Sequence, residues 1–224
     1  MNDKYKDVER GDATRKALID AAIKVFARDG FHAASTRELA NAANVNLALI
    51  NYYFKGKQGL YLAAFEEITT QIKSEIVPVE DKIRLCLERH DWSTLDMDGR
   101  KEILLPLLLE MANVFLQLLT SDKTKEWAQL IMREQQEPTA AFEYVFSTFI
   151  RPMLTQIISL IKVLRNTDED EAAMITFSVF GLLVVWRVVR TGILRRMNWT
   201  TIGEEELQKI LPVVHRNIIA LVFA

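Results

Sequence analysis

With 224 residues, the chain is longer than one average domain and shorter than two, a length that suits a small head on a larger body. Half of the residues are apolar while only 8 are Gly and 5 are Pro, a composition that excludes a disordered chain and favours helices over strands. The single cysteine excludes an internal disulfide and a cysteine-based zinc site, and the three scattered histidines predict no metal site.

Charge is distributed unevenly along the chain, although the net charge is only −2. Residues 1–60 contain ten Lys or Arg and seven Asp or Glu, whereas the remaining residues contain eighteen and twenty-three. A mildly basic head on an acidic body is the pattern expected if only the head meets phosphate.

Two long apolar stretches bear on the question of a membrane. Ala172–Trp186 has fifteen residues, fewer than a bilayer-spanning helix needs, and the stretch 103–119 is interrupted by Glu110. Both are predicted to be buried helices. The first ten residues are charged and polar, so we expect no signal peptide. The protein is therefore expected to be cytoplasmic, with no membrane partner.

The first helix is predicted to run from Asp12 to Gly30. Asp12 can cap its start, and Gly30 can supply the left-handed residue that stops it. The apolar positions between them recur at i, i+3, i+4, i+7 and i+8, the spacing of an amphipathic helix, at Leu18, Ala21, Ala22, Val25 and Phe26.

The stretch 35–54 has the spacing of a helix-turn-helix. Ser35 and Glu38 form a capping-box pattern that starts a short second helix. Asn44 tolerates the left-handed geometry of the following turn, and Asn46 is a capping residue for a third short helix.

A fourth helix is predicted from about Lys57 to Ile76, where Pro78 ends it. Pro106 and Pro152 lie inside two later helical patterns and are expected to kink them. No segment has a convincing strand pattern, so the predicted fold is all-α. The further helical segments are predicted at about 79–90, 99–120, 122–136, 138–165, 169–196 and 204–222.

The third helix is the candidate DNA-reading element. Ile50 and Phe54 are four residues apart and face inward, so the remaining side chains face outward. Amides on such a face can pair with base edges in a major groove, and phenols and lysines can reach phosphates. The starts of both short helices add unpaired N–H groups that can bind phosphate. The predicted DNA-binding residues are Thr36, Arg37, Asn46, Leu47, Ala48, Asn51, Tyr52, Tyr53, Lys55 and Lys57.

Each of these residues also has a plain structural interpretation. Tyr52 and Tyr53 can be half-buried packing residues, and the two lysines can belong to a solvated turn. Taken together, at this spacing and beside two capped helix starts, they favour DNA binding.

The segment Ala17–Leu60 resembles the DNA-binding head of the TetR family of bacterial one-component repressors. The run STRELANAANVNLALINYYFKGKQGLY is similar to that family's characteristic stretch, and the shared features include Thr36, Ala40, Ala43, Val45, the aromatic pair before Phe54, Lys57 and Leu60. The chain departs from the pattern at Asn44, where the family has Gly, and at Asn51, where it commonly has Tyr. Asn51 at this position implies either that Tyr52 makes the phosphate contact instead or that the protein prefers a different DNA sequence.

This resemblance implies a homodimer on double-stranded operator DNA, an inducer pocket in the body, and a dimer interface on the last two long helices. The run WAQLIMREQQEPTAAFEYVFSTFIRPML resembles one subgroup of the family, whose members often lie beside efflux-pump genes. The expected division is an N-terminal three-helix DNA-binding domain at 12–72, with its helix-turn-helix motif at 35–54, and a larger C-terminal helical ligand-binding and dimerisation domain at 79–224.

The body offers apolar surface and carries no catalytic motif that we recognise. Pairing two copies would cover the segments 142–161 and 172–194, which are apolar nearly all round. Arg133 and Glu134 are expected to form an ion pair on a helix face. Met and aromatic residues at helical spacing are pocket candidates, although each alone can be ordinary core: Met111, Phe115, Trp127, Ile131, Phe142, Phe146, Met174 and Phe177.

We therefore expect a ligand-responsive repressor that binds a (pseudo)palindromic operator as a dimer and is released by a small apolar or amphipathic molecule, without a cofactor or enzymatic activity. A transcriptional activator of the same fold is the first alternative, because the sequence does not distinguish activation from repression. A helical hydrophobe-binding protein or enzyme is less favoured. It would explain the apolar body but not the capped helix pair or Lys57.

Overall fold

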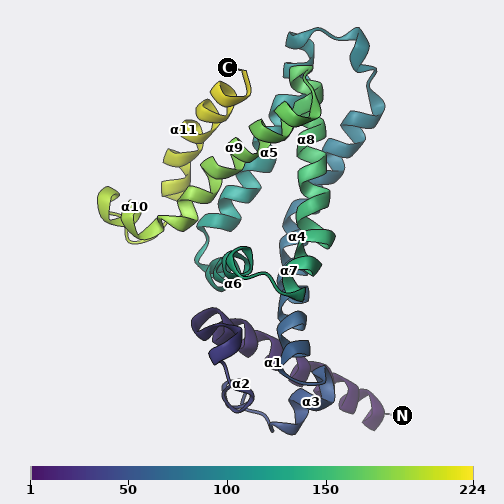
Figure 1. The fold of residues 1–224 in the computed structure, drawn as a ribbon, viewed down its shortest axis with the longest axis vertical. Helices are drawn as coiled ribbons and strands as arrows, with labels where there is room; N and C mark the ends of the chain where they lie inside the picture. Colours follow the sequence, from purple (N-terminus) through teal and green to yellow (C-terminus); the bar gives the residue numbers. More distant parts are fainter. Residues whose placement is uncertain (1, 224) are drawn as a thin grey trace. The chain divides into compact units, whose positions relative to one another are not determined.

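The structure, a computed structural model, describes residues 2–223, and side-chain surroundings are described from residue 11 onward. Every regular element in these residues is helical, so the prediction of an all-α fold is confirmed (Figure 1). The helices form two compact units, which we describe separately. The first unit combines the chain up to Gln71 with Lys125–Ser147, and the second combines Ile72–Thr124 with the chain from Thr148 onward.

The first unit contains the helix-turn-helix. Its elements are α1 (Asn2–Ala33), α2 (Thr36–Ala42), α3 (Ala48–Phe54), the first part of α4 (Lys57–Arg89), α6 (Lys125–Gln136) and α7 (Ala140–Val145). Both α2 and α6 pack against α1, and α3 packs against α2. The sequence-based division placed 125–147 in the C-terminal domain, whereas in the structure this segment groups with the N-terminal helices. The largest fully buried side chains of this unit include Leu18, Phe26, Leu39, Ile50, Leu60 and Phe65.

Helix α1 begins at Asn2, well before the predicted start, so Asp12 lies inside the helix and does not cap it. The residues before Asp12 are rich in Lys, Glu and Arg, which are good helix formers, and one internal Gly costs only about 1 kcal/mol. Gly30 breaks the helical geometry as expected, with φ 79° and ψ 171°.

Helix α4 continues through Pro78 to Arg89, so the predicted end at Ile76 and the separate helix at 79–90 are wrong. Proline removes one backbone hydrogen bond from a helix but does not have to end it. Pro78 lies on the exposed side, whereas Ile76, Val79 and Ile83 are buried. Burial of that apolar face outweighs the lost hydrogen bond.

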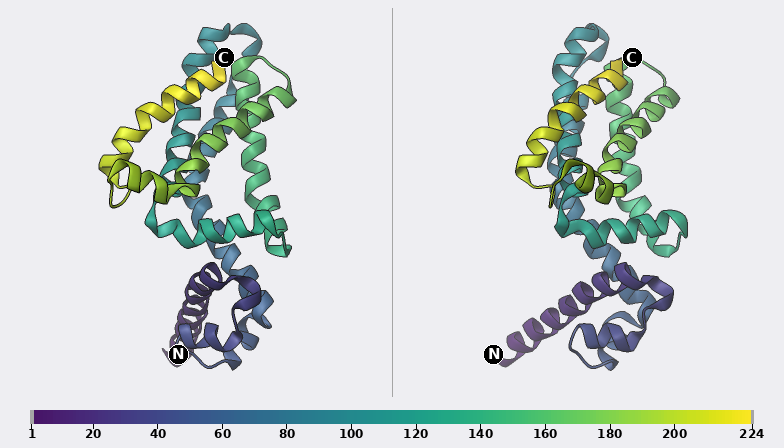
Figure 2. Two further views of the ribbon diagram at one scale, coloured as in Figure 1. Left: turned by 60° about the vertical axis from the view of Figure 1, so that its left-hand side comes forward. Right: turned by 90° about the vertical axis from the view of Figure 1, so that its left-hand side faces the viewer.

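The second unit is a bundle of long helices (Figures 1 and 2). Its elements are the rest of α4, the 3₁₀ turns η1 (Trp92–Thr94) and η2 (Asp122–Thr124), α5 (Met97–Thr120), α8 (Arg151–Arg165), α9 (Glu169–Val188), α10 (Arg190–Met197) and α11 (Glu204–Phe223). Helices α5, α8 and α9 pack against one another, and α11 packs on α5 and α9. The fully buried core side chains include Leu104, Leu116, Leu160, Ile161, Leu164 and Ile218.

Two helices expected to be continuous are interrupted. The segment 138–165 contains α7, a π-helical turn (Phe146–Ile150) and α8. Pro152 follows that turn, and the wider turn relieves the clash between its ring and the preceding carbonyls. The segment 169–196 breaks at Val189 (φ −103°, ψ 20°). Pro106, by contrast, lies inside α5, which continues through it.

Three helical stretches of the described chain are long and apolar enough to cross a membrane, judged by length and composition alone. They are Met97–Thr120, Ala140–Arg165 and Glu169–Val188. The length argument made from the run Ala172–Trp186 is therefore wrong, because α9 extends beyond that run at both ends. Helices α5, α8 and α9 pack against one another in the second unit, but only 22% of the apolar window of α9 is buried, so the prediction of a buried helix at 172–186 is wrong for most of its side chains.

Gly30→Ala is expected to lower the stability of the first unit. The backbone angles of Gly30 lie in a region that costs other residues of order 1–3 kcal/mol. An added Cβ would also overlap the Arg133 guanidinium. Urea unfolding followed by circular dichroism should show a lower free energy of unfolding. Gly192→Ala, whose Cβ would meet nothing within 4 Å, is the control; unchanged stability of Gly30→Ala would contradict the prediction.

Candidate nucleic-acid interface

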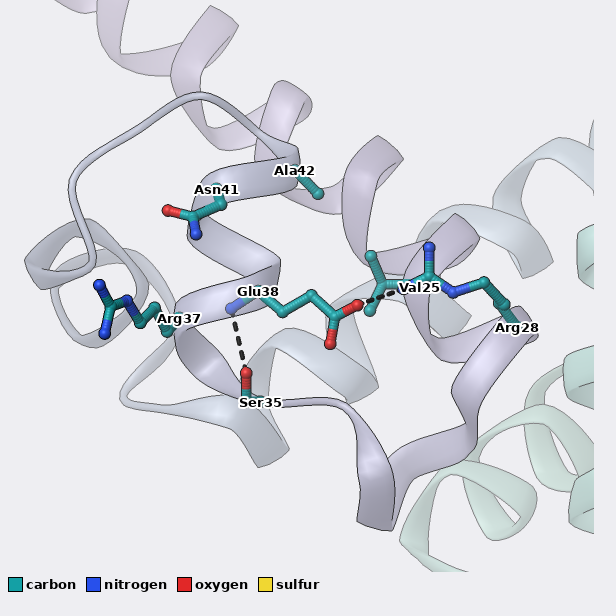
Figure 3. A pocket seen from close by; sticks show the side chains of 7 residues that line it. All are labelled: Val25, Arg28, Ser35, Arg37, Glu38, Asn41 and Ala42. Carbon is teal, nitrogen blue, oxygen red and sulfur yellow. Dashed lines mark hydrogen bonds and ion pairs between the residues drawn. The ribbon is translucent and has the colours of Figure 1, made fainter.

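The start of α2 is held by Ser35. Its Oγ accepts a hydrogen bond from the Glu38 backbone N–H at 3.1 Å, as the capping pattern predicted. The Glu38 carboxylate forms an ion pair with Arg28 of α1. It therefore links two helices and does not complete the capping box. An open cleft beside this pair is lined by residues that include Arg37, whose side chain points away from Glu38 and Arg28 in Figure 3. Arg37 is thus exposed on another side of α2.

The turn between α2 and α3 depends on one left-handed residue. Asn44 has φ 53°, in agreement with its predicted role. The next residue, Val45, is half-buried and donates its backbone N–H to the Ala40 carbonyl at 3.0 Å. Asparagine therefore supplies the left-handed turn geometry, which it tolerates better than most residues other than glycine.

A second cap and two buried side chains fix the orientation of α3. The Asn46 side chain accepts a hydrogen bond from the Ala48 backbone N–H at 2.8 Å, so the predicted capping role of Asn46 is confirmed. Ile50 and Phe54 are 1% and 6% exposed. Because these two residues point into the core, the opposite face of α3 points into solvent.

The solvent face of α3 consists of the residues predicted to read DNA. Ala48 and Asn51 are exposed, Leu47 is 44% exposed and Tyr52 is 77% exposed. Such exposure of a large aromatic side chain is unusual for a residue that serves packing alone. The packing interpretation of Tyr52 is therefore not supported.

Tyr53 is placed differently from Tyr52. The two rings meet edge to face, with centroids 4.9 Å apart. Tyr53 is half-buried, and a Cβ added at Gly11 of α1 would lie 3.4 Å from its hydroxyl group. This position beside Gly11 of α1 makes Tyr53 partly a packing residue.

Two lysines flank the junction of α3 and α4. Lys55 is exposed and adopts φ 57° at the end of α3. The Lys57 ammonium donates to the His32 carbonyl at 3.3 Å and lies 4.7 Å from the centroid of the Phe31 ring. These contacts hold the start of α4 against the end of α1. An ammonium has three N–H donors, so Lys57 keeps donors for a further acceptor.

The pocket candidates of the body do not form one site. Met111 and Phe115 line a cavity of about 20 Å³ in the second unit, which holds at most one water. Met174 and Phe177 are 64% and 57% exposed on α9, so they do not line that cavity. Helical spacing predicts that Met174 and Phe177 share one face of a helix, but it does not predict whether that face is covered by other helices. The other four candidates are half-buried in the first unit: Trp127, Ile131, Phe142 and Phe146.

The expected ion pair between Arg133 and Glu134 is wrong. Glu134 is 3% exposed and accepts a hydrogen bond from the Tyr61 hydroxyl at 2.7 Å. Arg133 donates to the Arg28 carbonyl at 3.2 Å. Adjacent helix residues point about 100° apart, so one faces the interior while the other lies along the surface. No sequence pattern predicts the buried contact between Glu134 and Tyr61.

Known families match two separate parts of the chain. Residues 18–64 match the family described as "Bacterial regulatory proteins, tetR family". Residues 107–224 match the family described as "HTH-type transcriptional dual regulator CecR, C-terminal domain". The first match contains α2 and α3, and the second contains most of the second unit.

Individual relatives are similar over nearly their whole length. The HTH-type transcriptional dual regulator CecR of Shigella flexneri is 33% identical over 208 residues, which cover 92% of this chain and 89% of that protein. A TetR-like transcriptional regulator from Rhodococcus sp. RHA1 has a TM-score of 0.62 at 18% identity, covering 92% and 96% of the two chains. The fatty acid degradation regulator FadR from Bacillus halodurans has a TM-score of 0.55 at 20% identity, covering 93% and 94%. The two solved structures share the fold.

Proposed function

Because the chain belongs to the TetR family of bacterial transcriptional regulators, we propose that it is a cytoplasmic, ligand-responsive repressor that binds a (pseudo)palindromic operator as a homodimer. The observation that carries the proposal is the exposed face of α3, where Asn51 and Tyr52 stand opposite the buried Ile50 and Phe54. In this proposal residues 12–72 contain the DNA-binding helices and 79–224 contain the ligand-binding and dimerisation helices, apart from the segment 125–147, which groups with the first unit.

The DNA contacts divide into base reading and phosphate binding. Asn51 reads a base edge in the major groove, and Leu47 and Ala48 lie against base edges beside it. The phosphate contacts come from the hydroxyl, amide, phenol and cationic groups around α3, because these groups surround the reading face without competing for it. They are Thr36, Arg37, Asn46, Tyr52, Tyr53, Lys55 and Lys57.

In this proposal the dimer interface is formed by the last two long helices, α9 and α11, with α9 as its main surface. Met174, Phe177, Val185 and Val188 are each at least 40% exposed, and they follow one another at intervals of three, eight and three residues along the helix. Together with Gly181, which lies between them, they form an apolar seam of the kind that two helices bury against each other. Met174 and Phe177 therefore serve dimerisation in this proposal and not ligand binding.

The inducer is a small apolar or amphipathic molecule. Met111 and Phe115 line a cavity whose other walls are apolar, with Thr176 as the single polar contributor. At about 20 Å³ the cavity is too small for such a molecule, so binding has to enlarge it. If the ligand binds only the state in which the cavity is enlarged, ligand binding shifts the protein toward that state, and this shift can be coupled to DNA release.

Activation is the second candidate function. The relative from Shigella flexneri is named a dual regulator. A repressor that also activates needs no different fold, since the effect depends on where the operator lies relative to the promoter. Reporter fusions to the upstream region, with and without the gene for this protein, distinguish the two roles.

Lys57→Ala is expected to weaken binding to all DNA sequences about equally and to reduce the slope of log affinity against log salt by roughly one unit. The lost ammonium no longer neutralises a phosphate. Fluorescence anisotropy with an upstream duplex at several salt concentrations measures both quantities. Lys209→Ala, an exposed lysine of α11, is the control. An unchanged salt slope would show that Lys57 acts only through His32 and Phe31.

Asn51→Ala is expected to relax base preference at one position in each half-site. A bidentate amide–adenine contact contributes about 1–3 kcal/mol to discrimination. Competition with duplexes substituted at each position gives the preference profile, and Gln208→Ala on α11 is the matched amide control. The half-sites should be centred about 34 Å, or a multiple, apart. A footprint on one asymmetric half-site would contradict both the contact and the dimer.

Inducer and operator are expected to weaken each other's binding by the same factor, typically within about 5- to 150-fold. A molecule can release the protein from DNA only through its different affinity for the two states. Candidate molecules are first screened for one that abolishes the electrophoretic mobility shift of operator DNA by the protein. That molecule is then titrated by calorimetry into the protein, with and without operator. Equal affinity in both titrations would exclude this mechanism of release.

A further inference from the structure

Glu134 of α6 is a buried carboxylate surrounded by hydrogen-bond donors of the first unit. Its Oε1 accepts from the Tyr61 hydroxyl at 2.7 Å. Its Oε2 accepts from the Thr139 N–H at 2.8 Å, the Thr139 hydroxyl at 2.9 Å and the Phe142 N–H at 3.1 Å. All four donors are neutral, and together they come from α4 and from the turn that starts α7.

A carboxylate that is only 3% exposed is stable only when such a set of donors is complete. Moving α4 away from the α6–α7 turn would leave an oxygen atom of a buried charge without its partner. Burial, and then the hydrogen bond to Glu134, raises the pKa of Tyr61, so the phenol keeps the proton that it donates. The network therefore favours one arrangement of α4, α6 and α7.

The same turn is connected to the core of the DNA-binding head. The Tyr61 ring packs against Phe26 and Phe65, with centroid distances of 4.9 Å and 5.0 Å. On the other side of α6, Arg133 donates to the Arg28 carbonyl of α1, and its guanidinium group lies over Gly30, where a Cβ would not fit. Adjacent residues of α6 thus contact both α1 and α4.

We propose that Glu134 is a positioning residue for DNA recognition, through which the α6–α7 turn sets the operator affinity of the head. The proposal rests on the proposed function and adds a control element to it. The segment 125–147 belongs to the DNA-reading unit, so a change in this turn alters how α1 and α4 hold α3. Glu134 does not itself touch DNA in this account.

The test combines DNA binding with amide hydrogen exchange on the full-length protein. In the wild type, an upstream operator duplex should slow exchange of the Thr139 and Phe142 amides, because DNA favours the arrangement that Glu134 holds. Glu134→Ala should lower operator affinity about tenfold, within the range typical of coupling between sites, and abolish that protection. All measurements are made well below the melting temperature of each variant.

Two further variants separate positioning from general stability. Glu134→Gln should restore both affinity and protection, because the amide can accept from the α7 amides and donate to the Tyr61 oxygen. Glu137→Ala, an exposed acid on the same turn, should match the wild type. The proposal is overturned if Glu134→Ala binds operator like the wild type or if Glu134→Gln does not restore operator affinity. It is also overturned if operator leaves the exchange rates of the Thr139 and Phe142 amides unchanged. If the wild type binds no upstream duplex at all, the proposed function fails, and this inference fails with it.

Discussion

The solvent face of α3, which we propose reads DNA, exists only because the opposite face of this helix is buried. Helix α3 has seven residues, and isolated helices shorter than roughly 12–15 residues are barely stable in water. Its stability and its orientation both come from Ile50 and Phe54, which are almost completely buried in the head. The exposed amide and phenol are thus presented by packing rather than by any interaction of their own.

That burial needs a head whose other helices are held in place, and polar contacts between helices serve this purpose. Lys57 fastens the start of α4 to the end of α1 through the His32 carbonyl. Glu134 fastens α4 to the α6–α7 turn through Tyr61. Polar contacts of this kind are directional, whereas apolar packing alone tolerates sliding. They give the small head a defined geometry in addition to its apolar core.

The parts of the fold that could be predicted from the sequence are those decided locally. Capping by Ser35 and Asn46 and the left-handed turn at Asn44 each depend on residues at most three positions apart, and all three form as expected. Gly30 ends regular helix geometry because its own backbone permits angles that other residues avoid. The inward positions of α3 follow from helical periodicity in the same way. The helix-turn-helix can therefore be predicted without any knowledge of the rest of the chain.

Several failures concern residues whose state is decided by distant parts of the chain. Pro78 was taken to end a helix, but buried neighbours on both sides keep α4 continuous. Glu134 had the sequence pattern of a surface ion pair, and only Tyr61, far away in the sequence, makes its burial tolerable. Met174 and Phe177 show the opposite error, because they were expected to line a pocket and are exposed. An apolar helix face looks alike in sequence whether it lines a cavity, fills a core or stays exposed, and only the structure shows that Met174 and Phe177 are each more than half exposed.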